Sequence, residues 1–373
     1  MSIVSLLKYS NYNRDDLLTA INQSCKNISF DPVNLSGAKV AVKPNLLTAA
    51  LPESGVTTHP EFFRAVVLFI KEYNGTPVLV ESPAFFSLDK VLRKCGYDEI
   101  IKEEKILIAD TSKTAALKNE NGKKYKSFHV AEDIINSDFI LNLPKLKTHS
   151  LTYFTGAVKN LFGSIHSLEK SKWHVKTESE KEFISFLLDL YGAFLYSKTD
   201  RIISIMDGII GLEGEGPGKS GKPVISKAVI AGMDGIAVDT VAITVAGLDV
   251  NKSILCIEGE KRGLGVSSIN EIKITGDPLI DFNNSFIPPK TKSFIGRLPV
   301  STTLLKNMLI ERPFPDKEKC TLCYQCKTIC PAGVIEKSRN GEIPFYNYKK
   351  CIRCYCCMEI CPEGAIFLKK KLF

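Results

Sequence analysis

The sequence predicts an α/β fold with a mostly parallel sheet flanked by helices, followed by a small cysteine-rich α+β domain. Short apolar segments alternate with helical stretches through residues 1–280, which is typical of parallel sheets. Nine of the twelve cysteines lie after residue 317, and six of the eighteen prolines lie between residues 277 and 318. The proline-rich stretch indicates a linker. We therefore expect an α/β domain at 1–280, a linker at 281–316 and a cysteine-rich domain at 317–373.

Apolar runs and capping signals place the individual elements. Strands are expected at 39–43, 77–80, 105–110, 138–143, 201–206, 227–230 and 271–275. A helix is expected to begin at Thr58, because Thr58 and Glu61 have the spacing of a capping box and an apolar face follows. Further helical segments are expected at 88–95, 156–166, 183–195 and 239–246, with a helical patch at 302–310.

The cysteine-rich domain contains an internal repeat. Cys320, Cys323, Cys326 and Cys330, then Cys351, Cys354, Cys357 and Cys361, each follow the pattern C-x2-C-x2-C-x3-C-P, with an offset of 31 residues. This is the bacterial ferredoxin spacing for two [4Fe–4S] clusters, in which the fourth cysteine of each run serves the other cluster. We therefore assign Cys320, Cys323, Cys326 and Cys361 to cluster 1, and Cys351, Cys354, Cys357 and Cys330 to cluster 2.

Two alternatives to iron–sulfur clusters fit the cysteines less well. Zinc suits pairs of C-x2-C but not two runs of four, and disulfides require a secreted chain. Cys356 lies next to Cys357 and does not interrupt the spacing of the second run, so we expect it to be a spare thiol. The N-terminus has no features of a signal peptide, no apolar run is long enough to span a membrane, and cysteines are sparse before residue 317. We therefore expect a cytoplasmic protein that binds no membrane.

The net charge of +8 does not by itself indicate a nucleic-acid partner. From residue 317 onward there are 11 Lys and Arg against 5 Asp and Glu, a surplus of six. Eight thiolates and two clusters would add negative charge that this surplus partly compensates. No basic stripe interleaved with aromatic residues is present, so we expect no nucleic-acid partner.

Polar residues gather at the expected strand ends, where doubly wound sheets place their ligands. They are Lys43, Asn45, Glu81, Ser82, Lys145, Lys147 and Asp207. If residues 144–150 are extended, Lys145, Lys147 and His149 point to one side. Lys159 and Asn160 could join them, and such a set of donors would bind a carboxylate or phosphate. The alternative is that these lysines are ordinary solvated loop residues.

The roles of His149, Asp207 and Glu213 complete the candidate site. His149 could be a general acid, or a loop histidine that only forms hydrogen bonds. Asp207 opens a glycine-rich loop, 207–221, whose Glu213 could form a carboxylate-bearing wall or part of a lid; a plain surface loop is equally compatible. The loop nearly matches a dinucleotide fingerprint and a P-loop, but a strand follows the first and a glycine is missing from the second.

Four segments resemble a family known as domain of unknown function 362. They are Val42-Lys-Pro-Asn-Leu46, Leu143-Pro-Lys-Leu-Lys-Thr-His149, Thr155-Gly-Ala-Val-Lys-Asn-Leu-Phe-Gly163 and Asp207-Gly…Gly211-x-Glu213-Gly-x-Gly-Pro217. The resemblance covers roughly residues 35–250, and some members look like this chain in carrying a C-terminal ferredoxin module. Where such proteins often have Gly-Asp-Ser-Pro, this chain has Val80-Glu81-Ser82-Pro83. The resemblance implies one site at the strand ends but no settled reaction.

Two functional hypotheses follow. In the first, the protein is an oxidoreductase whose two [4Fe–4S] clusters pass single electrons from a ferredoxin-like donor to an anionic small molecule. Lys43, Lys145, Lys147 and Lys159 would stabilise its negative charge, and His149 or Asp207 would move protons. A flavin could couple one- and two-electron steps, although no residue pattern indicates one. In the second hypothesis, the protein is a non-catalytic carrier or assembly factor whose large domain docks a protein partner.

Overall fold

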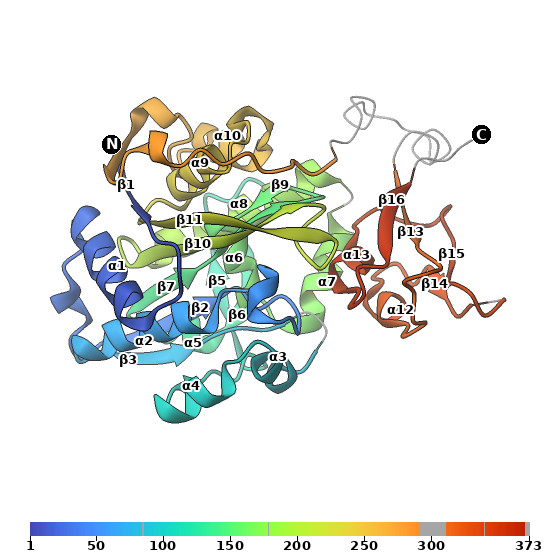
Figure 1. Ribbon diagram of the computed structural model, residues 1–373, viewed down its shortest axis with the longest axis horizontal. Helices are drawn as coiled ribbons and strands as arrows, with labels where there is room; N and C mark the ends of the chain where they lie inside the picture. Colours follow the sequence, from blue (N-terminus) through green and yellow to red (C-terminus); the bar gives the residue numbers. More distant parts are fainter. Residues whose placement is uncertain (84–85, 178, 291–310, 339, 370–373) are drawn as a thin grey trace.

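The computed structural model consists of a large α/β domain and a smaller domain that carries the cysteine runs (Figure 1). It describes residues 1–83, 86–177, 179–290, 311–338 and 340–369. The predicted α/β class with a large, mostly parallel sheet is confirmed. None of the helices in these segments combines the length and the apolar character that crossing a lipid bilayer requires.

The large sheet has the strand order β12-β1-β11-β10-β7-β2-β3-β4. From β10 through β7, β2 and β3 to β4, each strand runs parallel to the next, and β1 runs parallel to β12. Strand β11 is antiparallel to both neighbours. The strands are β1 (Ser2–Lys8), β2 (Lys39–Pro44), β3 (Thr76–Leu79), β4 (Leu107–Ile108), β7 (Phe139–Leu143), β10 (Ile202–Gly214), β11 (Gly221–Gly232) and β12 (Ile272–Gly276).

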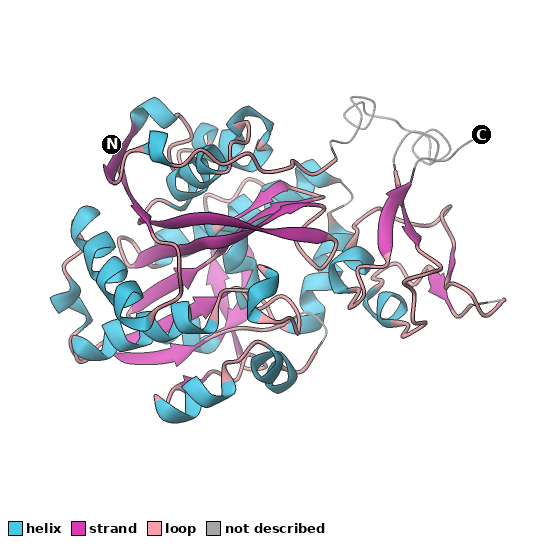
Figure 2. Ribbon diagram, in the orientation of Figure 1, coloured by secondary structure: helices cyan, strands magenta, loops and turns pink. Residues whose placement is uncertain are grey.

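Helices cover both faces of this sheet (Figure 2). Side chains of α1 (Arg14–Asn27), α2 (Pro60–Glu72), α3 (Leu88–Lys94) and α4 (Asp98–Glu103) share one apolar core. Side chains of α6 (Ala157–Asn160), α8 (Glu180–Ser197), α9 (Gly235–Val245) and α10 (Ile254–Lys261) share the other. Successive side chains of β2 point to opposite faces of the sheet. Val40 and Val42 therefore belong to the first core and Ala41 to the second.

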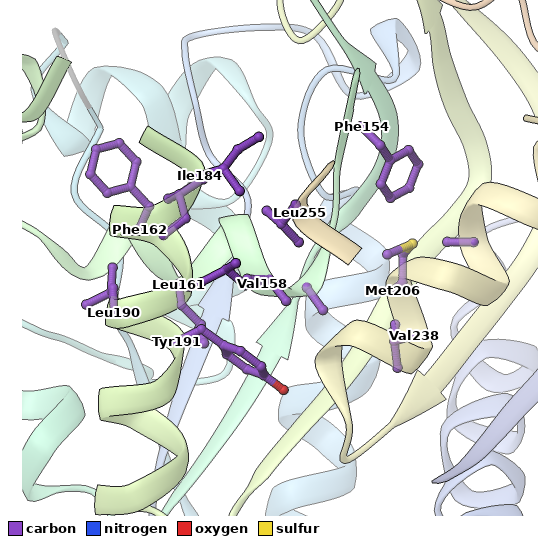
Figure 3. Packing of buried hydrophobic residues seen from close by; sticks show 14 of the residues in the cluster. Phe154, Val158, Leu161, Phe162, Ile184, Leu190, Tyr191, Met206, Val238 and Leu255 are labelled. Carbon is purple, nitrogen blue, oxygen red and sulfur yellow. The ribbon is translucent and has the colours of Figure 1, made fainter. Parts of the chain in front are cut away.

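The second core holds the short helix α6 in place. In Figure 3, Val158 and Leu161 lie among Ile184, Leu190 and Leu255, which come from α8 and α10. The small sheet β5 (Thr114–Lys118) with β6 (Ser127–Ala131) and helix α5 (Glu132–Asn136) also contribute to this core. Because α6 has only four residues, packing rather than helix propensity fixes its position.

The glycine-rich segment expected as a loop is largely strand. Strand β10 continues to Gly214 and β11 begins at Gly221, so only residues 215–220 form the hairpin tip. The glycines serve close packing: a Cβ at Gly208 would lie 2.8 Å from the Ala228 carbonyl oxygen, and one at Gly211 would lie 2.7 Å from the Phe286 ring. Glycine inside a strand often marks such close approach.

The helix start predicted at Thr58 is wrong by two residues. Helix α2 begins at Pro60, and His59 is its N-cap, with Nδ1 accepting the Glu61 N–H at 3.2 Å. Thr58 Oγ1 instead accepts the Asn45 N–H and donates to the Leu143 carbonyl oxygen. Thr58 therefore ties together the segments that follow β2 and β7.

The smaller domain begins earlier than residue 317. Strand β13 (Arg312–Pro315) pairs with β16 (Ile366–Lys369), so residues 312–315, expected in the linker, belong to this domain. It also contains β14 (Ile335–Glu336) paired with β15 (Phe345–Tyr346), and helices α12 (Gln325–Ile329) and α13 (Cys356–Ile360). The helical patch expected at 302–310 lies outside the described residues.

Candidate functional site

The two cysteine runs adopt the same backbone geometry. Leu322 and Tyr324 have φ angles of 55° and 58°, and Arg353 and Tyr355, each 31 positions later, have 59° and 60°. Residues other than glycine rarely adopt this left-handed conformation. Its repetition turns both loops so that successive thiols can face one point, as ligands of a cubane must.

The thiols gather in two sets. One cavity is lined by three cysteines of the first run and one of the second, namely Cys320, Cys323, Cys326 and Cys361. Burial raises the pKa of Cys330, and the nearby Cys354 and Cys351 raise it further. Within the described residues, no three His, Cys, Asp or Glu side chains are arranged to hold a single metal ion. The four thiols that line one cavity, Cys320, Cys323, Cys326 and Cys361, fit the ligand set of one [4Fe–4S] cluster.

A second cavity, of about 90 Å³, lies between the two domains at the carboxyl edge of β2 and β3. The α/β domain contributes polar walls and the cysteine-rich domain contributes a mainly apolar one. The polar residues from the α/β domain are Lys43, Asn45, Glu81, Ser82, Thr155, Lys159, Asn160, Ser167, Lys170 and His174; the smaller domain contributes Ile329, Cys356, Glu359 and Ile360. We call this space the interdomain cavity.

Glu81 holds two lysines in the wall of the interdomain cavity. Its carboxylate lies 2.7 Å from the Lys43 ammonium and 3.9 Å from that of Lys170, and it also accepts the N–H groups of Leu46 and Ser82. Burial lowers the pKa of Lys170 to about 8. Gly163 leaves room for this arrangement, because a Cβ there would lie 2.5 Å from Lys43 Nζ.

A chain of amide side chains crosses the strand ends. The Lys147 ammonium donates to Asn45 Oδ1 at 2.8 Å, Asn45 Nδ2 donates to Asn160 Oδ1 at 2.8 Å, and Asn160 Nδ2 donates to Asn142 Oδ1 at 2.8 Å. Lys147 also donates to the Val56 carbonyl oxygen. Since Asn45 and Asn160 line the interdomain cavity and are fixed by these partners, they present preset polar groups to a ligand.

Lys159 differs from the other lysines of the cavity. In the described part of the chain, no hydrogen bond or ion pair engages its ammonium group, and burial lowers its pKa. Its helix, α6, is held by Asp239 of α9, whose carboxylate accepts the Ala157 and Val158 N–H groups at 2.5 and 3.2 Å. A buried cation without a partner is unfavourable. Lys159 is therefore the group best suited to pair with an anion in the cavity.

His149 connects the two domains rather than lining the cavity. Its Nδ1 accepts the N–H groups of Leu151 and Thr152, which leaves the proton on Nε2. Nε2 lies 3.3 Å from Oε1 of Glu359 on α13. Burial lowers the pKa of His149 to about 4, so the ring is neutral near pH 7. Burial alone would raise the pKa of Glu359, but His149 and Lys159 lower it overall.

The structure places Lys145 and Asp207 away from the interdomain cavity. Their side chains are fully buried and form an ion pair of 2.7 Å. Asp207 also accepts hydrogen bonds from the Tyr12 hydroxyl and the His59 N–H, and the rings of Tyr12 and His59 stack at 3.6 Å. Lys145 therefore balances the charge of Asp207, and both carboxylate oxygens of Asp207 accept hydrogen bonds.

Strand β8 (Lys145–His149) is extended, so Lys145, Lys147 and His149 do alternate with their neighbours. They contact different partners, namely Asp207, Asn45 and Glu359, and do not converge on one point. Strand β9 (Tyr153–Thr155) pairs with β8 and brings Thr155 to the cavity.

Glu213 and the hairpin tip contact the linker and the smaller domain. Glu213 accepts the Ile287 N–H at 2.8 Å and does not line the interdomain cavity. A Cβ at Gly218 would lie 2.5 Å from the Glu359 carbonyl oxygen, and the Ser220 hydroxyl donates to the Ile366 carbonyl oxygen. The glycine-rich tip therefore packs closely against the cysteine-rich domain, where larger side chains would not fit.

Sequence reasoning missed the cavity residues of helix α7 (Ser167–Lys176). Ser167, Lys170 and His174 follow the spacing i, i+3, i+7, which places them on one helical face toward the cavity. That spacing is visible in the sequence, but a polar stripe normally indicates a solvated face. Cys356 was expected only as a spare thiol and Glu359 was not predicted, because the cysteine spacing assigns no role to the residues between the ligands.

The protein thus combines an α/β domain with a C-terminal cysteine-rich domain, and residues of both line one cavity. Its family is shown by comparison: residues 40–244 match the model of the domain of unknown function (DUF362), and the chain belongs to that family. Residues 312–362 match a 4Fe-4S dicluster domain, which supports [4Fe–4S] binding and a role in electron transfer.

Two further proteins are similar to this chain. The thylakoid-associated protein sll1697 from Synechocystis is 29% identical over 250 residues, covering 66% of this chain and 75% of that protein. The lactate racemase apoprotein from Thermoanaerobacterium thermosaccharolyticum aligns with a TM-score of 0.37 and 12% identity, covering 62% of this chain and about half, 54%, of that one.

Proposed function

We propose that this protein is an oxidoreductase that passes single electrons through two [4Fe–4S] clusters to an anionic small molecule in the interdomain cavity. The observation that carries the proposal is the shared wall of that cavity. Cys356, between the cluster 2 ligands Cys354 and Cys357, faces the same space as Lys43 and Lys159 of the α/β domain. A ligand there would lie beside the loop that holds cluster 2.

The exposure of the ligands suggests a direction for the electrons. Cys323, assigned to cluster 1, is exposed, whereas none of the four thiols assigned to cluster 2 is exposed. We place electron entry at cluster 1, from a ferredoxin-like or other low-potential donor, and exit at cluster 2. When bound, the clusters supply one-electron redox chemistry.

The protein's own groups would bind and orient the ligand. Lys159 would pair with its anionic group, and the fixed amides of Asn45 and Asn160 would accept or donate further hydrogen bonds. The cavity of about 90 Å³ is smaller than the 300–1,000 Å³ typical of sites for drug-sized ligands. The proposal therefore concerns a small metabolite and includes no flavin.

The test is anaerobic reduction of the holo-protein followed by mixing with fractions of a metabolite extract. One fraction should reoxidise the clusters, seen by their absorbance, and yield a product two mass units heavier. Lys159→Met should slow this reaction, whereas the same change at Lys118, exposed on β5, should not. Full turnover in Lys159→Met would remove the assigned anion site.

The alternative is a non-catalytic carrier or assembly factor whose large domain docks a protein. It predicts rapid electron exchange with protein partners but no reoxidation by any metabolite fraction. We retain the cytoplasm as the proposed compartment, because the cluster thiols, together with buried Cys25, Cys95 and Cys256, require reducing conditions. The Synechocystis relative is named as a thylakoid-associated protein. We propose neither a nucleic-acid nor a membrane partner.

A further inference from the structure

His174 packs against aromatic rings and also lines the interdomain cavity. Its ring stacks on Phe183 with centroids 4.4 Å apart, and the edge of Phe162 lies against it at 6.1 Å. These aromatic contacts fix the plane of the ring. Across the residues that the structure describes, no hydrogen bond engages either ring nitrogen, and the side chain lines the interdomain cavity.

The two predicted proton carriers, His149 and Asp207, do not line the interdomain cavity. His149 accepts two backbone N–H groups through Nδ1 and turns Nε2 toward Glu359. Asp207 is locked by Lys145 and Tyr12 at a distance from the cavity walls. Among the described histidines, His174 is the one that combines a packed ring with a position on the cavity wall.

We propose that His174 takes up a proton when cluster 2 is reduced and delivers it to the ligand in the interdomain cavity. This inference rests on the proposed function. In the first step, the oxidised cluster gains one electron from the low-potential donor while His174 gains one proton from solvent. In the second, the electron passes to the ligand and the proton passes from His174. Two such cycles add two electrons and two protons, which matches a product two mass units heavier.

The electrostatic surroundings support this coupling. The charged groups that share the cavity wall with His174 are Glu359 on α13, Lys159 on α6, Lys43 on β2 and Glu81 after β3; Lys170 lies on its own helix. Burial lowers the pKa of His174 to about 4, with Glu359 raising it and Lys159 lowering it, so the ring is neutral near pH 7. An added electron beside α13 favours the charged ring, and by linkage the protonated ring favours reduction.

The test requires no identified substrate. In the holo-protein, the midpoint potential of one cluster should fall by about 59 mV per pH unit over a range above pH 5, because each tenfold change in proton activity shifts a one-electron couple by that amount. The other cluster should show a flat profile and serves as an internal control. The potentials are followed by redox titration with electron paramagnetic resonance.

His174→Gln should flatten the sloping profile, and the same change at His129, exposed on β6, should leave the slope intact. His174→Asn provides a second variant if the first fails to assemble its clusters. A flat profile for both clusters of the wild-type protein, or a slope that persists in the His174 variants, would overturn the inference. Anion binding and turnover, tested through Lys159, are separate measurements, so the two proposals can fail independently.

Discussion

The unpaired state of Lys159 leads to a prediction in which binding and stability change in opposite directions. Lys159→Met removes a half-buried ammonium that has no hydrogen bond or ion pair among the described residues, while keeping an apolar stem. Hydrogen bonds to charged groups contribute about 1.5–3 kcal/mol. Their loss should weaken binding of a small anion by roughly 10- to 150-fold, given that about 1.4 kcal/mol corresponds to a tenfold change.

Whereas Lys159→Met should weaken anion binding, it should not lower the stability of the protein, because holding an unpaired charge away from water is unfavourable. Lys159→Met should therefore unfold at the same temperature as the wild-type protein or at a higher one. Lys145→Met is the matched contrast, since it leaves Asp207 buried without its cation. Breaking such a pair is expected to destabilise the protein by about 3–5 kcal/mol.

Both effects can be measured on the holo-protein. Acetate and phosphate serve as probe anions, titrated while the electron paramagnetic resonance signal of the reduced clusters is recorded. Stability is followed as thermal loss of cluster absorbance. The reasoning is refuted if Lys159→Met lowers the unfolding temperature as much as Lys145→Met does, or if its anion titration matches that of the wild-type protein.

Three further predictions concern the clusters, the domain contact and pH. Cys361→Ser should lose about half of the iron, whereas Cys356→Ser should retain all of it; iron analysis distinguishes a ligand from a spare thiol. Gly218→Ala places a methyl group against the Glu359 carbonyl oxygen and should loosen the domain contact; linker cleavage by trypsin no faster than in the wild-type protein would contradict this. Burial raises the pKa of Asp239 to about 7, so stability from this group is full below about pH 4, the unfolded pKa, and is lost as pH rises through 7. Asp239→Asn should flatten that decline in denaturation measured across pH, and an equal decline in the variant would count against it.

Elements with a clear apolar pattern could be predicted closely from the sequence. The strand expected at 39–43 is β2, Lys39–Pro44, because its residues face an apolar core on both sides. Strand β1, Ser2–Lys8, was not predicted, since an apolar segment at the start of a chain has no local feature that reveals pairing with β11 and β12. The glycine-rich segment was misread for a related reason. Tertiary pairing overrides local propensity when a neighbouring strand supplies the hydrogen bonds.

The candidate site could be predicted only in part. The rule that ligands lie at strand ends led to Lys43, Asn45 and Glu81, all of which line the interdomain cavity. It could not separate these from Lys145 and Asp207, because the rule places residues at one edge without indicating which of them pair with each other. A buried internal pair and a free cation look alike in a sequence.

The internal repeat contains a signal for the remaining half of the site. The two runs share their cysteines but differ at residues that lie between the cysteines. Lys327 and Thr328 of the first run are exposed. The equivalent residues of the second run are Met358, which is buried, and Glu359, which contacts His149. A symmetric two-cluster domain needs no such difference. Where a repeat keeps its ligands but replaces solvent-facing residues with buried ones, that half packs against another surface. The departures from the repeat therefore identify α13 as the helix of the smaller domain that packs against the α/β domain.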